Sequence, residues 1–351
     1  MKKIGIATFH YADNYGAVLQ AYALRKTING FDSCQAELIN YVPNGYEIFP
    51  YEASAIGISC MRKKRDLYEQ FLIEHCNIST PMINIITGTN YDYCCTGSDQ
   101  VWNMSFAENI TKEYLLPNVK SDIKCFSYAA SVGGQISDEN KDIFKHCLSK
   151  FIGLSVREKS VLNLLKEIGI NNAEVSLDPT LLLNIEDYEE LIVAPENAPN
   201  NFLFFFSYPI GDEVRKYAPF INMLARKYEL KIKHSIVNAP RGLFAPDIGT
   251  MIYEGIGEFL WYMMNASIVV TTSYHGAIFG NLFHKPTYII CRNAGKERFL
   301  QLMDIFGNDK CFVDDKWMFR EWNIEDCGIS EKKLHIWKRK SVDYLRKVLN
   351  A

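Results

Sequence analysis

A run of β-branched residues that leads straight into a histidine and a glycine constrains this chain more than any other segment. Residues 268–272 are all isoleucine, valine or threonine, which is typical of a strand buried on both faces. Residues 276–283 fit a short helix that ends before Lys285 and Pro286. We therefore expect His275 between the carboxyl end of a buried strand and the start of a helix.

That position suggests a ligand site. Ligands of open α/β sheets bind at the carboxyl ends of the strands, and a helix start offers free N–H groups to an anion. Ser273 and Gly276 would then help to bind a phosphate or carboxylate. His275 could hydrogen-bond to that anion or transfer a proton near neutral pH. The alternative is a histidine that only satisfies backbone groups at a tight turn.

Length and composition favour a two-domain globular protein. A chain of 351 residues exceeds what one core usually supports. The net charge of -3 argues against a nucleic-acid surface, and no apolar run is long enough to predict a transmembrane helix. The ten cysteines show no C-x-x-C spacing, so reduced, buried thiols are expected rather than a zinc site. These features suggest a cytoplasmic protein.

Short apolar runs alternate with helical patterns along the chain, which predicts α/β domains with parallel sheets. A polar linker with two prolines, residues 195–201, separates two such series. We expect an N-terminal domain over residues 1–195, a C-terminal domain over residues 196–330, and a final helix over residues 331–351 that can cross back. The expected strands are residues 4–8, 36–39, 93–96, 124–128, 151–156, 202–208, 231–237, 268–272 and 287–291.

Two segments between these elements carry surface features. Residues 44–57 are irregular and aromatic, which favours a loop or a lid. The basic run from Met61 to Arg65 is more typical of a solvated helix face than of a binding patch, although a lipid-linked acceptor could use it.

The loop after the first strand contains Asn14, Tyr15 and Gly16 and opens a helix predicted over residues 17–28. In a doubly wound fold this loop approaches the ligand, so these three residues are candidates for binding an acceptor. The loop lacks G-x-G-x-x-G, which weakens a dinucleotide interpretation. Asn14 and Gly16 could equally serve only to make the turn.

A second polar loop, residues 97–103, follows a predicted strand. It combines a carboxylate, two amides and an indole, a set that suits recognition of a sugar. The candidate acceptor residues here are Ser98, Gln100, Trp102 and Asn103, and Asp99 is a candidate catalytic carboxylate. The alternative is that Ser98 or Asp99 caps the next helix.

Several charged residues are expected at the same edge of the sheets. Arg157 ends a predicted strand and could clamp an anion or pair with a neighbouring carboxylate. Asp178 could face the cleft or form a turn before Pro179. Three cations follow the strand next to His275 and could lie beside it; they are Arg292, Lys296 and Arg298.

Taken together, these motifs resemble the polysaccharide pyruvyl transferase family. The similarity extends from about residue 3 to about residue 312, and its motifs are residues 14–20, 97–103, 127–133, 156–158, 177–180 and 272–276. It implies two Rossmann-like domains facing a cleft, as in GT-B glycosyltransferases. It also implies transfer of a pyruvyl group from phosphoenolpyruvate to two sugar hydroxyls, giving a cyclic ketal and phosphate.

The resemblance makes Arg157 the cleft arginine of the family and His275 its histidine. The chemistry needs a proton for the enol methylene and a base for the sugar hydroxyls. His275 is the candidate for proton transfer, and Asp178 or Asp99 would orient or deprotonate the acceptor. No cofactor or metal is required beyond phosphoenolpyruvate as co-substrate.

This chain departs from the family at one position. Many members have Arg-Leu-His where this chain has Ser273, Tyr274 and His275. One donor-binding arginine is therefore absent, and either Arg292, Lys296 or Arg298 supplies the charge, or the chain uses another donor.

Two other functions stay open. One is a GT-B glycosyltransferase that uses a nucleotide sugar, although residues 276–291 contain no carboxylate to hold a ribose. The other is a non-catalytic sugar-binding relative. The expected partners are phosphoenolpyruvate and a sugar or lipid-linked oligosaccharide, with peripheral contact at the inner face of the membrane and no nucleic acid. The sequence does not predict the oligomeric state.

Overall fold

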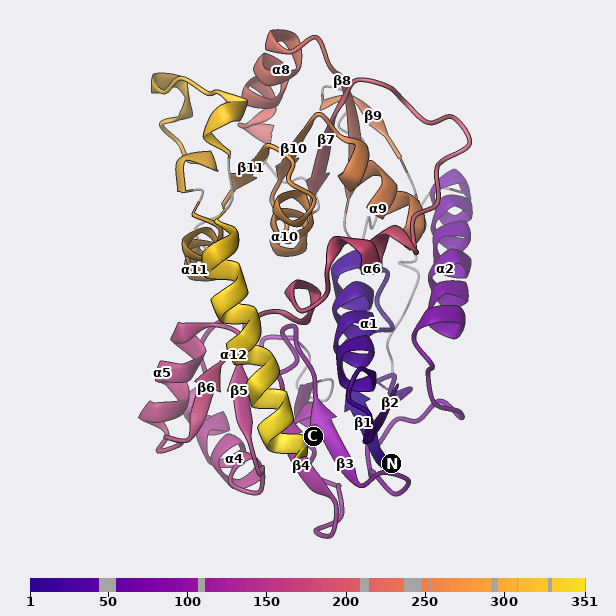
Figure 1. The fold of residues 1–351 in the computed structure, drawn as a ribbon, viewed down its shortest axis with the longest axis vertical. Coiled ribbons are helices and arrows are strands. Elements are labelled where there is room, and N and C mark those ends of the chain that lie inside the picture. The colour runs from indigo at the N-terminus through magenta and orange to yellow at the C-terminus, as the bar shows by residue number, and fades with distance from the viewer. Residues whose placement is uncertain are drawn as a thin grey trace.

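The protein forms two α/β halves in a computed structural model that describes residues 1–43, 55–106, 111–208, 215–236, 248–252, 254–291, 296–307, 309–327 and 330–350 (Figure 1). Strands of the first half come from residues 2–175 and strands of the second half from residues 202–313. All strand pairs in the described residues are parallel. The predicted α/β class with parallel sheets is therefore confirmed.

The first half contains a four-stranded sheet in the order β2-β1-β3-β4, and the pair β5-β6 continues its β4 edge through single bridges such as Ala130 to Val156. Strand order reverses between β1 and β3. The elements are β1 (Lys2–Ala7), α1 (Tyr15–Asn29), β2 (Cys34–Leu38), α2 (Ala55–His75), β3 (Tyr93–Thr96), β4 (Lys124–Ser127), α4 (Asp138–Leu148), β5 (Leu154–Val156), α5 (Lys159–Glu167), β6 (Ala173–Val175) and α6 (Ile185–Glu189), with 3₁₀ turns η1 (Lys112–Leu115) and η2 (Pro179–Leu181).

The second half contains a six-stranded sheet in the order β12-β11-β10-β7-β8-β9. Its central strands β7 and β10 are buried at every position, as their apolar sequences require. Strand order reverses between β7 and β10. The elements are β7 (Phe202–Ser207), α8 (Ala218–Lys227), β8 (Lys231–Ile236), β9 (Thr250–Met251), α9 (Ile256–Asn265), β10 (Ile268–Thr271), α10 (Tyr274–Leu282), β11 (Thr287–Ile290), α11 (Lys296–Phe306), β12 (Phe312–Val313) and α12 (Glu331–Leu349), with 3₁₀ turns η4 (Asp309–Cys311), η5 (Trp317–Phe319) and η6 (Ile324–Asp326).

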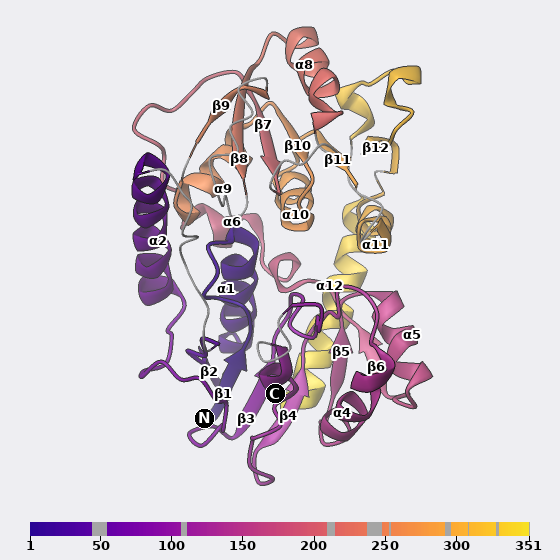
Figure 2. The same cartoon turned by 180° about the vertical axis from the view of Figure 1, so that it is seen from behind.

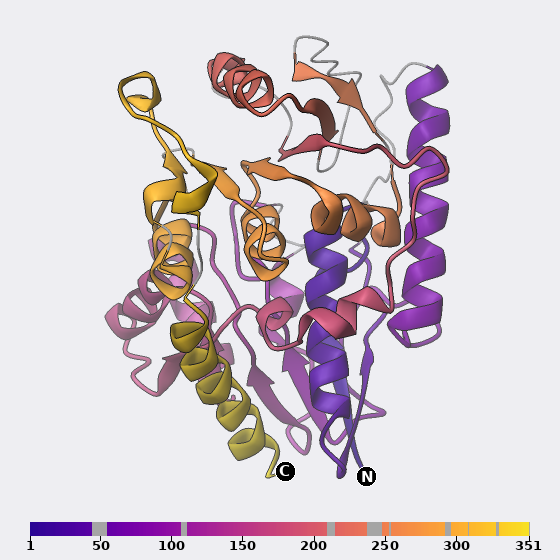
Figure 3. The same cartoon turned by 45° about the horizontal axis from the view of Figure 1, so that its top comes forward.

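Helices join the two halves. Helices α9 and α10 pack on α1, and α2 runs alongside and packs against α9 (Figure 3). The C-terminal helix α12 crosses from α11 to the first half (Figure 2). There, the Tyr344 hydroxyl donates to the Ser127 carbonyl at 2.7 Å, and the Leu177 N–H donates to Ser341 Oγ at 2.9 Å. One apolar cluster therefore spans both halves.

Most expected elements agree with the structure to within a few residues, and three predictions need comment. Helix α10 begins at Tyr274, so His275 lies inside its first turn rather than before it. Of the loop or lid predicted over residues 44–57, residues 44–54 lie outside the described residues, and Ala55 already begins α2. The expectation that all cysteines are free thiols is wrong, because Cys311 and Cys327 form a disulfide that the sequence spacing did not indicate.

Candidate functional site

The candidate site lies where the two strand-order reversals face each other. Asn14 follows β1 and Asp99 follows β3, the two strands that flank the reversal in the first half. His275 follows β10, and Tyr208 follows β7, which flank the reversal in the second half. Parallel sheets bind ligands at such reversals, and we use the term cleft for the region between the halves where these four residues lie.

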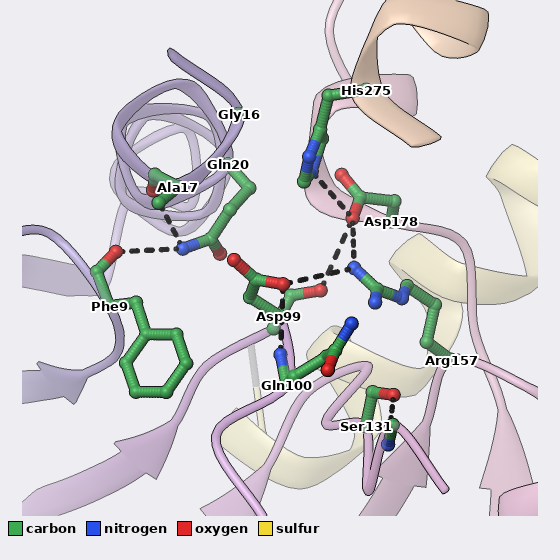
Figure 4. Close-up of polar contacts among 12 residues, drawn as sticks. Phe9, Gly16, Ala17, Gln20, Asp99, Gln100, Ser131, Arg157, Asp178 and His275 are labelled. Carbon is green, nitrogen blue, oxygen red and sulfur yellow. Dashed lines mark hydrogen bonds and ion pairs between the residues drawn. The ribbon is translucent and has the colours of Figure 1, made fainter. Parts of the chain in front are cut away.

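Asp178 is the centre of the polar contacts in this cleft (Figure 4). It follows β6 and its side chain is fully buried. One carboxylate oxygen, Oδ1, accepts hydrogen bonds from the Thr180 backbone N–H at 3.0 Å and from its hydroxyl at 2.6 Å. The other oxygen, Oδ2, accepts from Arg157 Nη1 at 3.1 Å and from Ser98 Oγ at 3.3 Å.

These contacts hold Asp178 as a carboxylate. Burial raises the pKa of its carboxyl group, but His275, Arg157 and the hydrogen bond from Thr180 together lower that pKa below its ordinary value. A group with such a low pKa is a weak base. The structure therefore favours the orienting role for Asp178 over deprotonation of an acceptor.

Arg157 follows β5 and has an exposed fraction of only 2%. Its Nε donates to Glu158 at 2.9 Å, its Nη1 donates to Asp178, and Asp99 Oδ1 lies 3.8 Å from Nη1. Burial lowers the pKa of its guanidinium, but the carboxylates, Glu158 foremost, raise it well above its ordinary value. The structure confirms that Arg157 pairs with neighbouring carboxylates, and its clamping of an anion stays a prediction.

His275 lies opposite these residues, and its Nε2 is 3.4 Å from Asp178 Oδ2 (Figure 4). Its ring also packs on Gly16 at the start of α1, where a methyl group would overlap Nδ1. Asp178 and Gly16 thus fix the imidazole from two sides. The arrangement is that of a carboxylate–histidine pair, which can hold a proton or pass it on.

Ser273 and Gly276 build the start of α10. Ser273 is the N-cap, and its Oγ accepts a hydrogen bond from the Gly276 N–H at 3.4 Å. A methyl group on Gly276 would collide with Thr271, so this glycine allows the helix to lie close to β10. The Gly276 N–H is already capped and is not available to an anion, in contrast to the prediction for these two residues.

The loop after β3 divides into exposed and buried residues. Asp99 and Gln100 are partly exposed at the cleft, and Asp99 adopts a left-handed backbone conformation with φ of 74°. Ser98 is buried and donates to Asp178, and Asn103 Nδ2 donates to Gln100 Oε1 at 2.8 Å. Trp102 is completely buried, with its Nε1 donating to the Tyr114 carbonyl at 3.1 Å. The prediction that Trp102 contacts an acceptor is therefore wrong.

The loop after β1 shows a similar division. Asn14 is the N-cap of α1, and its Oδ1 accepts from the Gly16 N–H at 3.0 Å. Tyr15 is fully buried between the halves, stacked on Phe259 at 4.2 Å, and its hydroxyl donates to Glu254 at 2.9 Å. Asn14 and Gly16 thus lie at the cleft, whereas Tyr15 is a core residue and cannot contact an acceptor.

The three expected cations after β11 differ in position. Arg292 lies outside the described residues. Lys296 is exposed, with its Nζ 5.6 Å from the centre of the Phe312 ring. Arg298 is half-buried, with its Cζ 5.7 Å from the centre of the Tyr274 ring. Of the two cations that can be placed, Arg298 is the one beside the site.

Sequence reasoning missed Tyr274, Tyr208 and Thr180. Arg157 Cζ lies 4.6 Å from the centre of the Tyr274 ring. Burial raises the pKa of Tyr208, while the charges of Arg298 and Arg157 lower it. Thr180 anchors Asp178. In the sequence, each of these three residues closely follows a predicted strand or lies close to a charged residue, and that position could have identified it as a site residue.

The described residues also bear on metal binding and membrane insertion. Across the described ranges, no group of three or more His, Cys, Asp or Glu side chains is arranged to hold a metal ion. Within the same part of the chain, every helix is too short or too polar to traverse a bilayer.

A family model described as polysaccharide pyruvyl transferase matches residues 14–291. That range includes the second-half reversal between β7 and β10, and it includes β3 but not β1 of the first-half reversal. It also includes every residue of the cleft discussed above except Arg298 and Lys296. No curated protein matches the sequence.

Solved structures that resemble the chain include UDP-GlcNAc 2-epimerase from Neisseria meningitidis bound to UDP-GlcNAc. It is 11% identical with a TM-score of 0.51, and the match covers 99% of this chain and 100% of that chain. The UDP-GlcNAc 2-epimerase from Methanocaldococcus jannaschii is 15% identical with a TM-score of 0.50, over 100% and 99% of the two chains. At such identities the likeness establishes the fold, which is GT-B-like.

Proposed function

Since the chain belongs to the polysaccharide pyruvyl transferase family, we propose that it transfers a pyruvyl group from phosphoenolpyruvate to two hydroxyls of one sugar. The products are a cyclic pyruvate ketal and inorganic phosphate. The acceptor is a sugar of a surface polysaccharide or of its lipid-linked precursor.

The observation that carries this proposal is the pairing of His275 with Asp178 next to Arg157. The Asp178 carboxylate lies 3.4 Å from His275 Nε2 and 3.1 Å from Arg157 Nη1. A cleft that combines a proton carrier with fixed cationic groups suits a reaction in which an anionic donor must be protonated on carbon.

The proposed reaction proceeds in two additions. His275 delivers a proton to the methylene carbon of phosphoenolpyruvate, which leaves a positive charge on the carbon that carries the phosphate oxygen. The first sugar hydroxyl adds to that carbon and loses its proton. The C–O bond to phosphate then breaks, the second hydroxyl adds and loses its proton, and the ketal closes. Of the two protons released, one replaces the proton on His275 and the other leaves with phosphate or solvent.

Each residue has a distinct role in this scheme. Asp178 orients His275 through the contact of its Oδ2 with His275 Nε2. Asp99 is the candidate base for the acceptor, since its Oδ2 accepts no hydrogen bond from the described residues and its side chain is 15% exposed. Arg157 and Arg298 bind the donor, and Asn14 and Gln100 contact the acceptor.

The scheme needs no metal or further cofactor. Phosphoenolpyruvate is made inside cells, so the proposal places the protein in the cytoplasm, where a lipid-linked acceptor would be met at the inner face of the membrane.

The test is to incubate the protein with phosphoenolpyruvate and a panel of galactosides, mannosides and N-acetylmannosaminides while measuring released phosphate. Acceptor-dependent release, together with a ketal methyl signal in the product's NMR spectrum, supports the proposal. Release of UDP from UDP-sugars without use of phosphoenolpyruvate would instead indicate a glycosyltransferase. Binding of phosphoenolpyruvate without turnover of any acceptor would indicate a non-catalytic relative.

A further inference from the structure

Tyr274 lies between two arginines that come from different halves of the protein. Its ring centre is 4.6 Å from Arg157 Cζ, which follows β5 in the first half. The same ring centre is 5.7 Å from Arg298 Cζ on α11 in the second half. Tyr274 is itself buried, with an exposed fraction of 7%. One aromatic ring therefore holds two guanidinium groups near each other.

The two arginines differ in their charge partners. Arg157 has Asp178, Glu158 and Asp99 around it, so its positive charge is balanced by the protein. Arg298 forms no ion pair with any described residue, and its buried Nε has no hydrogen-bond partner there. A buried, unpaired guanidinium nitrogen is costly unless a ligand satisfies it. The buried Nε of Arg298 therefore leaves a donor that an anion beside Tyr274 could satisfy.

An aromatic ring suits this task because of how it contacts a guanidinium group. The negative face of the ring attracts the planar cation and offsets the repulsion between the two arginines. Stacking uses the flat face of a guanidinium group and leaves its N–H edge free to donate to an oxyanion. A carboxylate in place of Tyr274 would neutralise the charge that the ligand needs.

We propose that Tyr274 is a positioning residue that sets Arg298 beside Arg157, so that the two arginines together bind the oxyanions of the donor. The ligand class is a small phosphate ester or carboxylate. This inference rests on the proposed function for the identity of the donor. In this arrangement, Arg298 on α11 supplies the charge of the arginine that is absent at Ser273. Tyr274 holds Arg298 in place.

The experiment measures anion binding directly, by titrating phosphoenolpyruvate and inorganic phosphate into each protein in a calorimeter. The variants are Tyr274→Phe, Tyr274→Leu, Arg298→Gln and the double variant Tyr274→Leu/Arg298→Gln. Arg339→Gln on α12 controls for net charge, because that side chain is 80% exposed. Thermal melting shows whether each variant is folded.

Tyr274→Phe keeps the ring, so its dissociation constants should stay within about twofold of wild type. Tyr274→Leu should bind both anions roughly 2- to 30-fold more weakly, the range that a cation–π contact supplies. The double variant should bind no more weakly than Arg298→Gln alone, because Tyr274 acts through Arg298. If Tyr274 had a purely structural role, the double variant would instead show the product of the affinity losses of Tyr274→Leu and Arg298→Gln.

The inference is overturned if Tyr274→Leu binds the anions as tightly as wild type, or if Tyr274→Phe and Tyr274→Leu lose the same affinity. It is also overturned if the loss of affinity in the double variant is the product of the losses in the two single variants. The absence of anion binding in the wild-type protein would overturn it as well. If Tyr274→Leu does not fold, Arg298→Lys tests the same geometry, since an ammonium keeps the charge without the planar face; unchanged binding by that variant would overturn the inference. Ring-dependent anion binding without phosphate release from any acceptor would leave the inference standing and reject the proposed function.

Discussion

Gly16 lies directly against the imidazole ring of His275, so close that a methyl group on its α-carbon would overlap Nδ1. The contact joins the first turn of α1 to the first turn of α10 and therefore links the two halves at the cleft. Gly16 also donates its N–H to Asn14 Oδ1. The first loop contributes to the site mainly by allowing this close approach.

Gly16→Ala should shift the His275 ring or push α1 away from α10. Overpacking of this kind costs about 1–3 kcal/mol of unfolding free energy, and turnover should fall because the His275–Asp178 geometry is lost. Denaturant unfolding and phosphate release measure the two effects. Gly134→Ala is the matched control, because a methyl group there would meet nothing within 4 Å. Wild-type turnover in Gly16→Ala would contradict the prediction.

His275→Gln should lower turnover by ~10²–10⁴-fold while phosphoenolpyruvate binding is largely kept. Glutamine retains a hydrogen-bonding side chain of similar reach but cannot carry a proton. Phosphate release and donor binding should be measured on the same purified variant, with His284→Gln as control, whose side chain is 49% exposed. Lost binding with a normal rate at saturation would reduce His275 to an anion ligand.

Asp178→Asn should destabilise the protein, because it leaves the buried Arg157 without one of its partners. Removing one partner of a buried pair costs about 3–5 kcal/mol. Asp304→Asn controls for loss of an exposed ion pair, since Asp304 contacts Lys333 at the surface and is 62% exposed. If Asp178→Asn loses no more unfolding free energy than Asp304→Asn, the ion pair between Arg157 and Asp178 does not stabilise the fold.

The lowered pKa of Asp178 also predicts how the unfolding free energy depends on pH. Its pKa in the folded protein lies below the ordinary value of 3.8, so its contribution is complete above that value and is lost as pH falls below it. The wild-type protein should therefore lose more unfolding free energy than Asp178→Asn when the pH is lowered from 5 to 3. Urea unfolding at pH 5 and pH 3 measures these losses. If both proteins lose the same unfolding free energy between the two pH values, the prediction for Asp178 is wrong.

Glu254 should produce the opposite pH dependence. It is buried, and its Oε2 accepts hydrogen bonds from Tyr15 at 2.9 Å and from Ser235 at 3.2 Å. Burial raises the pKa of its carboxyl group from 4.5 to about 7, although the charge of Lys64 lowers it. The folded protein then holds more protons than the unfolded chain between these values, so stability falls as pH rises through them.

Glu254→Gln removes this titration while keeping the shape of the side chain. The wild-type protein should lose up to ~1.4 kcal/mol of unfolding free energy per pH unit between pH 5 and 7 through this group, and Glu254→Gln should lack that contribution. Urea unfolding at pH 5, 6 and 7 measures both slopes. Identical slopes in the two proteins would mean that Glu254 is already charged at pH 5.

Much of the fold follows from local patterns in the sequence. The apolar residues 202–207 and 268–271 form central strands because only apolar side chains fit a strand covered on both faces. The last helix, expected over residues 331–351, forms from Glu331 to Leu349 in the structure. The position of His275 at a cleft also follows, since ligands approach the carboxyl ends of parallel strands.

The sequence by itself therefore determined the elements, their parallel class and the edge of the sheets where the site lies, because each depends on residues close together in the chain. Tertiary structure alone decided which side chains of each polar loop reach the cleft. Trp102 and Tyr15 turned into the core, Lys64 of the basic run became buried over the Tyr15 ring, and Arg298 came to lie beside Tyr274. These outcomes depend on how distant helices and strands pack, and a local pattern of polar and apolar residues does not encode the neighbour that an element will meet.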